Sequence, residues 1–354
     1  MDKNRYLLMG CGAVGGVLAA GIIEKGYDLD IVTHNEQITK AVNEQGLIVK
    51  TSGGLRKVQA KAYTSLKEVK PGYDVVFLTM KAIGIEKIAS DAAQYLKPDG
   101  FVITLQNGIV EDKVSEVIGK QRVVGGLIGW GATMSAPGNY HMTSEGECII
   151  GELDGSISQR CKNIKIVMES AVPTSISNNI YGVLWSKLAI NCVITTLGAI
   201  SGQILGKMLL KHSVRELALV LVSEVMDAAH ASGIILEPVG GTLDLKRLYL
   251  PQEERKTGQG RIYLSKHIIL GVVGIKFWKL KSSMLQSLER GRQPEIDFMN
   301  GFVVDQANRH AIPAPLNTRL VEIVREIVAG KREIQPVNIN ELYFFSKGIE
   351  HEKV

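Results

Sequence analysis

A glycine-rich segment near the start of the chain has the spacing of a phosphate-binding turn. It follows the apolar run 5–9 directly and opens a helical stretch. The six residues of this GxGxxG pattern are Gly10, Cys11, Gly12, Ala13, Val14 and Gly15. The first glycine permits a tight turn, the second lets the backbone approach a pyrophosphate, and the third packs the helix on a sheet. Because the start of a helix also favours an anion, the segment predicts a dinucleotide site. A glycine turn in some other α/β fold is the alternative.

The residues that end the second apolar run indicate which dinucleotide to expect. Enzymes that use NAD usually have an acid here for the ribose 2′-hydroxyl, and enzymes that use NADP have an Arg for the 2′-phosphate. This chain has Thr33, His34 and Asn35, and thus neither an acid nor an Arg. The missing acid argues against strict use of NAD, and the three polar side chains suit a phosphate. We therefore expect NADP (NADPH), with NAD as the alternative.

Short apolar runs alternate with helical periods in the first half of the chain, which is typical of parallel βαβ units. We expect strands at 5–9, 29–33, 74–79, 101–105, 123–126 and 148–151. Helices are expected at 17–25 and 85–96, after a glycine-rich turn at 10–16, and a loop at 135–140. The sequence predicts an α/β Rossmann domain with a parallel, doubly wound sheet at 1–178, which binds NAD(P).

The second half of the chain is dominated by helical periods. We expect helices at 184–199, 213–232, 282–290, 296–310 and 318–328. The segment 251–260 is polar and loop-like, whereas 268–275 is apolar and rich in glycine. The prediction is an all-α domain at 179–354 that binds substrate and carries the catalytic residues.

Several motifs, in this order, resemble those of the ketopantoate reductases (2-dehydropantoate 2-reductases). The central helix motif is Leu184-Trp185-Ser186-Lys187-Leu188-Ala189-Ile190-Asn191-Cys192-Val193-Ile194. A second motif combines Ser282-Ser283-Met284-Leu285-Gln286 with Glu295-Ile296-Asp297-Phe298-Met299-Asn300-Gly301. The glycine pattern, Thr79-Met80-Lys81-Ala82, Gln106-Asn107-Gly108, Ala311-Ile312-Pro313 and Asn317-Thr318 also match. The resemblance spans nearly the whole chain.

The resemblance implies NADPH-dependent reduction of ketopantoate to pantoate, a step in the biosynthesis of pantothenate and coenzyme A. It assigns catalysis to Lys187, as general acid, and to Glu295, which contacts the substrate hydroxyls. It assigns substrate binding to Asn191, Ser283, Asn107 and Thr195. Lys81 and Asn107 are expected where nicotinamide and substrate meet, and His34 at the 2′-phosphate.

The chemistry of Lys187 agrees with this assignment. Lys187 and Asn191 are four residues apart, so a helix places both on one face. Hydride addition to a ketone leaves an alkoxide that needs a proton and a positive neighbour, and a lysine in a closed cleft provides both. Taken singly, Lys187 is also explained as a surface lysine, and Glu295 as an acid in the first turn of a helix. The joint occurrence of the motifs favours an active site, which we expect in the cleft between the domains.

Three departures from the family pattern bear on the substrate. Thr195-Thr196 stands where the family often has Asn-Pro, and His34 is nearest to the position of an Arg in some members. The segment 250–281 is also longer than expected. A reductase of the same architecture that acts on another 2-oxo acid is therefore the main alternative. A dinucleotide sensor without catalysis is less favoured, because a sensor needs no proton donor.

Composition limits the other classes of function. The net charge is +5 among 354 residues, and the densest basic run, 276–281, is short, so no nucleic-acid partner is expected. The four cysteines form no CxxC pair and have no histidine at metal-ligand spacing, so we expect no disulfide and no metal site. Apolar stretches shorter than about 18 residues predict no membrane span. We expect a cytoplasmic enzyme with a small-molecule 2-oxo acid substrate, and 268–275 as a candidate homodimer interface.

Overall fold

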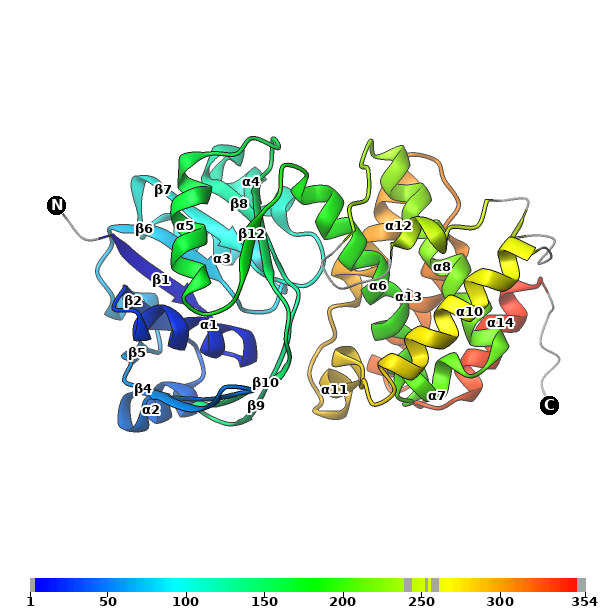
Figure 1. Cartoon of the computed structure of the whole chain (residues 1–354), viewed down its shortest axis with the longest axis horizontal. Helices are drawn as coiled ribbons and strands as arrows, with labels where there is room; N and C mark the ends of the chain where they lie inside the picture. The colour runs from blue at the N-terminus through cyan, green and yellow to red at the C-terminus, as the bar shows by residue number, and fades with distance from the viewer. Residues whose placement is uncertain (1–3, 239–243, 252–253, 256–260, 349–354) are drawn as a thin grey trace. The chain divides into compact units, whose positions relative to one another are not determined.

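The chain divides into two compact units, Met1–Leu184 and Trp185–Val354. The computed structural model describes residues 4–238, 244–251, 254–255 and 261–348. The first unit is built on β-sheets covered by helices, and the described part of the second unit is helical (Figure 1). This confirms the predicted fold class, a Rossmann-type α/β domain followed by an all-α domain.

The main sheet of the first unit has eight strands, with β1 (Arg5–Met9) inside it. β1 pairs in parallel with β2 (Asp28–Val32) on one side and β6 (Tyr73–Leu78) on the other. In order across the sheet, the strands are β12 (Thr174–Ile176), β11 (Cys148–Glu152), β8 (Val123–Ile128), β7 (Leu96–Thr104), β6, β1, β2 and β5 (Ala62–Tyr63). The pairing is parallel throughout except between β8 and β11. The chain crosses over in opposite directions from β1 and from β6, so the pair forms the topological switch point at which such sheets bind ligands.

Helices cover both faces of this sheet, as right-handed crossovers require. α1 (Ala13–Glu24) and α5 (Gln159–Glu169) pack together on one face, and α3 (Ile85–Ala93) packs with α4 (Glu111–Ile118) on the other (Figure 1). α2 (Glu36–Gln45) follows β2. α1 begins four residues before the predicted start at 17, because Gly15 and Gly16 lie inside the helix. α3 ends three residues before the predicted end at 96, because β7 already begins there.

A second, four-stranded sheet was not predicted. Its order is β4 (Gly54–Val58), β3 (Leu47–Thr51), β10 (Asn139–Ser144) and β9 (Gly131–Ala136). The predicted loop at 135–140 was wrong, since only Pro137 and Gly138 separate the antiparallel strands β9 and β10. The sheet brings β10 against α1 and so delivers a side chain to the glycine turn.

The helical unit contains the predicted helices at slightly different limits. They are α6 (Ile180–Ser201), α8 (His212–Ala231), α11 (Ser283–Glu289), η4 (Ile296–Phe298) with α12 (Asn300–Arg309), and α13 (Pro315–Val328). Four further elements were not predicted: α7 (Leu205–Leu209), η3 (Leu245–Arg247), α10 (Arg261–Lys276) and α14 (Val337–Ser346). The helix predicted at 296–310 is two elements, because Met299 has non-helical angles (φ −112°, ψ −100°). The apolar segment 268–275 is part of α10. The loop predicted at 251–260 lies mostly outside the described residues.

α6 is longer than the apolar stretches expected from the sequence. Ile180–Ser201 is long and apolar enough to cross a membrane by length and composition, although Lys187 and Asn191 interrupt it. However, 78% of its most apolar window is buried inside the protein's own fold. This is the pattern of a core helix.

Candidate active site

The carboxyl ends of four parallel strands bring the predicted residues of the first unit to one sheet edge. β1 leads into Gly10, β2 into Thr33 and His34, β6 into Thr79 and Lys81, and β7 into Asn107. Backbone hydrogen bonds tie these ends together: Gly10 N donates to Val32 O, Thr79 N to Met9 O and Leu105 N to Leu78 O, at 2.8, 2.9 and 3.1 Å. The edge lies at the switch point of the sheet, where a dinucleotide is expected.

The glycine turn fits the pyrophosphate of a dinucleotide. Gly10 has φ +99°, and a Cβ there would lie 2.6 Å from Met80 N. A Cβ on Gly15 would lie 2.1 Å from Gly10 O, so both glycines are required by the chain itself. Gly12 is different: its φ is −75°, and a Cβ would meet no atom within 4 Å. Gly12 leaves open space at the start of α1, which no side chain caps, and an anion can approach the backbone there.

Tyr140 of β10 holds the turn from the side that faces the core. Its hydroxyl donates to Cys11 O at 3.1 Å and lies 3.1 Å from Cys11 Sγ. A Cβ on Gly16 would come within 2.2 Å of the Tyr140 ring, so the ring packs closely against α1. Burial raises the pKa of the Cys11 thiol to about 11, and the thiol therefore stays protonated. Cys11 therefore contributes only its backbone to the surface of the glycine turn, and its thiol points into the core.

A cavity of about 510 Å³ runs along the same edge beyond β2. Thr33, His34 and Asn35, the residues expected near the 2′-phosphate of a dinucleotide, line it. Asn35 Oδ1 accepts a hydrogen bond from Ile38 N (3.1 Å) and caps α2, so its amide nitrogen is what remains for a ligand. Lys67 and Lys87 also line the cavity and were not predicted. Lys67 follows β5, a strand of two residues that leaves no apolar run in the sequence to mark its end.

In the second unit, α6 has one face that is not fully buried. Between Gly182 and Ser201 every residue is buried except Lys187, Ile190, Asn191 and Ile194, which are half-buried. These positions follow a helical repeat and lie on one side. An amine that can give a proton and an amide that can hold an oxygen thus lie one turn apart on this face. Thr195, the next predicted residue, is buried.

The motif Ser282-Ser283 is anchored to α6. Ser282 Oγ donates to Thr195 O at 2.6 Å and accepts from Leu285 N at 3.0 Å, so this side chain caps α11 and fixes it on α6. Ser282 is buried, whereas Ser283 is exposed. The helix-cap role belongs to Ser282, and Ser283 is the residue whose side chain a substrate can reach.

The segment that begins with Glu295 is anchored to α6 through Asn300. Glu295 is half-buried and precedes η4, and its side chain does not cap that turn. Asn300, at the start of α12, accepts a hydrogen bond from Thr196 Oγ1 (2.6 Å) and donates to Cys192 O (3.2 Å). Four of the predicted residues, Lys187, Asn191, Ser283 and Glu295, therefore lie on α6 or on two segments bound directly to it.

A buried polar network extends this anchor to α8 and α13. Asn300 Nδ2 donates to Asn317 Oδ1 at 2.9 Å. The Glu224 carboxylate accepts from Leu316 N, Asn317 N and Asn317 Nδ2 at 3.0, 3.0 and 2.8 Å. Burial raises the pKa of Glu224. Asn300 and Asn317 carried the sequence resemblance without an assigned role, and the network gives them one: they fix the Glu295 segment against the central helix.

Two sequence profiles of a single family match most of the chain. The profile described as Ketopantoate reductase PanE/ApbA matches residues 6–155, and that described as Ketopantoate reductase PanE/ApbA C terminal matches residues 179–328. The chain belongs to the ketopantoate reductase family. It is thus related to oxidoreductases that act on 2-oxo acids.

Curated members of the ketopantoate reductase family match along nearly their whole length. A 2-dehydropantoate 2-reductase of Archaeoglobus fulgidus is 27% identical over 334 residues, which is 93% of this chain and 100% of the relative. One from Pyrococcus horikoshii is 27% identical over 323 residues, 91% of this chain and 96% of the relative.

Solved structures show the same fold. A PanE/ApbA family ketopantoate reductase from Ralstonia eutropha has a TM-score of 0.78 and 24% identity over 92% of this chain and 99% of its own. A D-mandelate dehydrogenase solved with NADH and anilino(oxo)acetate has a TM-score of 0.77 and 17% identity over 92% and 99%.

Proposed function

We propose that this enzyme reduces 2-dehydropantoate to pantoate with NADPH, in the biosynthesis of pantothenate and coenzyme A. The observation that carries the proposal is the single half-buried face of α6, with Lys187 and Asn191 one turn apart. That face lies in the part of the chain that matches the C-terminal family profile. A reductase acting on another 2-oxo acid is the second candidate, because Thr195-Thr196 departs from the family pattern.

The proposed mechanism uses this chain's side chains to bind and protonate the substrate. A reduced nicotinamide, when bound, supplies the hydride to the carbonyl carbon. The carbonyl π electrons move to oxygen, and the Lys187 ammonium gives its proton to that oxygen, which yields the 2-hydroxy acid. Asn191 and Ser283 orient the substrate, and Glu295 accepts hydrogen bonds from its hydroxyl. Thr195 is buried and acts through its carbonyl, which binds Ser282. Lys81 and Asn107 are proposed to border the reacting atoms from the Rossmann unit.

Lys187→Ala is the direct test. Charge develops on the oxygen only as hydride arrives, so a proton donor stabilises the transition state more than the ground state. We expect kcat to fall at least ~100-fold, with little change in NADPH affinity. Lys187→Arg should not restore turnover, because a guanidinium keeps its proton at neutral pH. The control is Lys207→Ala, which changes an exposed lysine on α7. A kcat near wild type in Lys187→Ala would assign the proton to another group, first of all Lys81.

We also propose a preference for NADPH over NADH. The cavity beyond β2 has His34 and Lys67 on its wall and offers Thr33 and the Asn35 amide as hydrogen-bonding groups. Lys87 pairs with Asp91 at 2.7 Å, so its charge is already balanced. His34→Ala and Lys67→Ala should each lower the ratio of kcat/KM for NADPH to that for NADH. Lys40→Ala on α2 is the matched control. Equal ratios in wild type and variants would reject the assignment.

Two further features support a cytoplasmic homodimer. The four cysteines are free and buried, which suits a reducing compartment. α10 exposes an apolar stripe with a helical repeat: Leu264 is 63% exposed, Ile268 61%, Val272 59% and Ile275 70%. A stripe of this kind on one helix is self-complementary about a two-fold axis, so a second copy of the chain is the proposed partner.

A further inference from the structure

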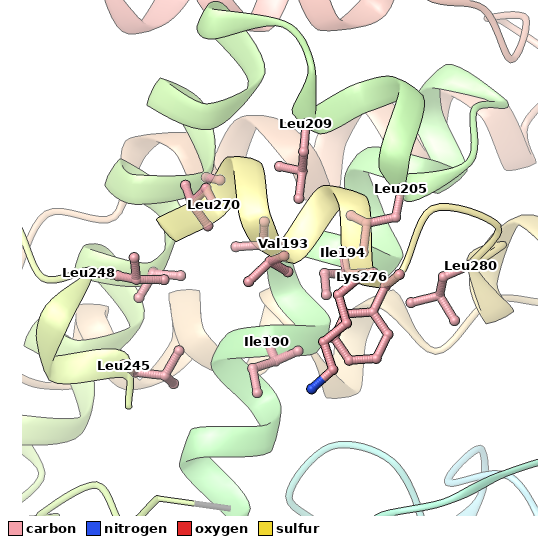
Figure 2. A pocket seen from close by; sticks show the side chains of 14 residues that line it. Ile190, Val193, Ile194, Leu205, Leu209, Leu245, Leu248, Leu270, Lys276 and Leu280 are labelled. Atoms are coloured by element: carbon pink, nitrogen blue, oxygen red, sulfur yellow. The ribbon is translucent and has the colours of Figure 1, made fainter. Parts of the chain in front are cut away.

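An apolar pocket in the helical unit is the feature that the proposed reaction leaves unused. Its volume is about 430 Å³, within the range of small-molecule sites. α6, α7, α8, η3 and α10 all contribute to its wall, with the stretch 277–280 that follows α10. Lys276 is the one charged residue among those that line it. Figure 2 shows the pocket, with α10 passing over α6 and leucines from α7 and η3 at its sides.

The pocket begins on the face of α6 that carries the proposed catalytic residues. Ile190 and Ile194 line it, and they are the other two half-buried residues of that face, alternating with Lys187 and Asn191. At 1.5 Å rise per residue, Ile190 is only about 4.5 Å along the axis from Lys187, and Ile194 the same from Asn191. A molecule held by Lys187 and Asn191 therefore has the pocket as its immediate neighbour.

Another part of the pocket wall leads to the proposed substrate serine. Leu280 lines the pocket, and Ser283 follows three residues later. Leu280 is fixed to α7 because its carbonyl accepts from Leu205 N at 2.9 Å. Ser282 is fixed to α6. The two anchors hold the pocket between α6 and the segment that presents Ser283, so the same two elements form the pocket and the substrate site.

We infer that the pocket receives the side chain of the 2-oxo acid, and that the enzyme reduces 2-oxo acids with long or bulky apolar side chains as well as 2-dehydropantoate. This inference rests on the proposed function of the same site. Lys187 and Asn191 hold the reacting carbonyl, and the chain beyond it extends along Ile190 and Ile194 toward Leu248 and Leu270. Binding of apolar side chains there is stabilised in proportion to the area removed from water. A hydroxyl loses its hydration in a pocket whose lining residues are all apolar except Lys276.

A homologous series of substrates tests this directly. The kcat/KM of the whole enzyme with NADPH is measured for 2-oxobutanoate, 2-oxopentanoate, 2-oxohexanoate and 2-oxooctanoate, with 2-dehydropantoate as reference. Each added methylene that enters the pocket should raise kcat/KM about fourfold. A flat or falling series, with 2-dehydropantoate still reduced, overturns the inference and leaves the proposed function standing.

Filling the pocket should abolish the dependence on chain length. Ala218 on α8 lines the pocket, and Ala218→Phe places a ring in it. The ratio of kcat/KM for 2-oxooctanoate to that for 2-oxobutanoate should fall toward one, and this ratio is insensitive to a general loss of folded enzyme. Ala218→Leu is the milder version and should give an intermediate ratio. Val328→Phe adds a ring at an exposed position on α13, away from the pocket, and should leave the ratio unchanged. The same ratio in all variants contradicts the assignment.

Binding separates a failure of the pocket from a failure of the reaction. N-alkyl oxamates have the head group of a 2-oxo acid but resist reduction, and their affinity for the enzyme with NADP present is measured by calorimetry. The affinity should rise about fourfold per methylene and lose this dependence in Ala218→Phe. If no 2-oxo acid is reduced but oxamate affinity rises with chain length, the proposed reaction is wrong and the assignment of the pocket to an apolar side chain is right. Constant oxamate affinity, with a change of molar mass on Ala218→Phe, would instead assign the pocket to a second copy of the chain.

Discussion

Replacing Thr196 with Val removes one hydroxyl from the network that fixes the Glu295 segment on α6. Thr196 Oγ1 donates to Asn300 Oδ1 at 2.6 Å, and both residues are 0% exposed. Valine has nearly the same shape, so the packing is kept. The Asn300 oxygen loses its donor in a place that water does not reach.

The size of the effect follows from two opposing contributions. A buried acceptor left without its donor costs about 1–3 kcal/mol. The methyl that replaces the hydroxyl gains up to about 1 kcal/mol by its burial. We expect a net loss of about 1–2 kcal/mol in the free energy of unfolding of the helical unit. Amide exchange that requires unfolding of this unit should therefore be about 5- to 30-fold faster.

Hydrogen exchange followed by mass spectrometry is the assay, because it reports each unit separately in a protein that need not unfold in one step. Peptides from α6, α12 and α13 should exchange faster, and peptides from β1 to β7 serve as the internal reference. Thr318→Val is the matched control: Thr318 is exposed, and its hydroxyl donates only to Ala314 O, the residue that precedes α13, at 2.9 Å. If both variants exchange alike, the network does not hold the segment in the way described.

Three other substitutions test separate parts of the structure. Burial raises the pKa of Glu111 to about 7, so its contribution to stability is fully present below about pH 4.5 and lost as the pH rises through 7. Glu111→Gln should therefore have the same Tm as wild type at pH 5 and a higher Tm at pH 8.5. The difference at pH 8.5 corresponds to about 2–3 kcal/mol in the free energy of unfolding. Identical pH profiles of Tm would contradict this. Gly16→Ala should weaken NADPH binding and lower stability by about 1–3 kcal/mol, because its Cβ meets the Tyr140 ring; Tyr140→Leu in the same chain should restore part of the stability, measured by urea unfolding. Ile268→Glu should halve the molar mass seen by light scattering if α10 forms the dimer interface, and an unchanged mass would exclude that interface.

The sheet edge of the site was predictable because its signals are local. The runs that became β1, β2 and β6 are short and apolar, and each ends in polar residues. Parallel strands put such ends at one edge, so the sequence alone is enough to assign Gly10, His34, Lys81 and Asn107 to it. The helix repeat likewise put Lys187 and Asn191 on one face.

The second sheet could not be predicted from local patterns. β3 pairs with β10, Val49 opposite Tyr140, across a long stretch of sequence, and β4 and β9 are largely solvent-facing strands without a clear apolar alternation. The role of Tyr140 behind Cys11 depends on this pairing. α10 was also missed, because its glycines weaken the helical pattern in the sequence. A Cβ on Gly274 would lie 2.8 Å from Leu209 Cβ, so this glycine lets α7 pack closely against α10.

The Thr195-Thr196 departure gains a physical explanation from the network. A proline at 196 has no N–H to donate to Cys192 O and no hydroxyl to donate to Asn300, and it disturbs a helix around itself. With threonine at 196, α6 is continuous from Ile180 to Ser201, and the Thr196 hydroxyl binds Asn300. The helix is then rigid through the position where Ile194 lines the apolar pocket and Ser282 binds Thr195 O. The substitution that made the substrate uncertain in the sequence thus lies where the wall of the proposed side-chain pocket is fixed. A change of substrate class should therefore follow from changes at 194–196 rather than at Lys187 or Glu295.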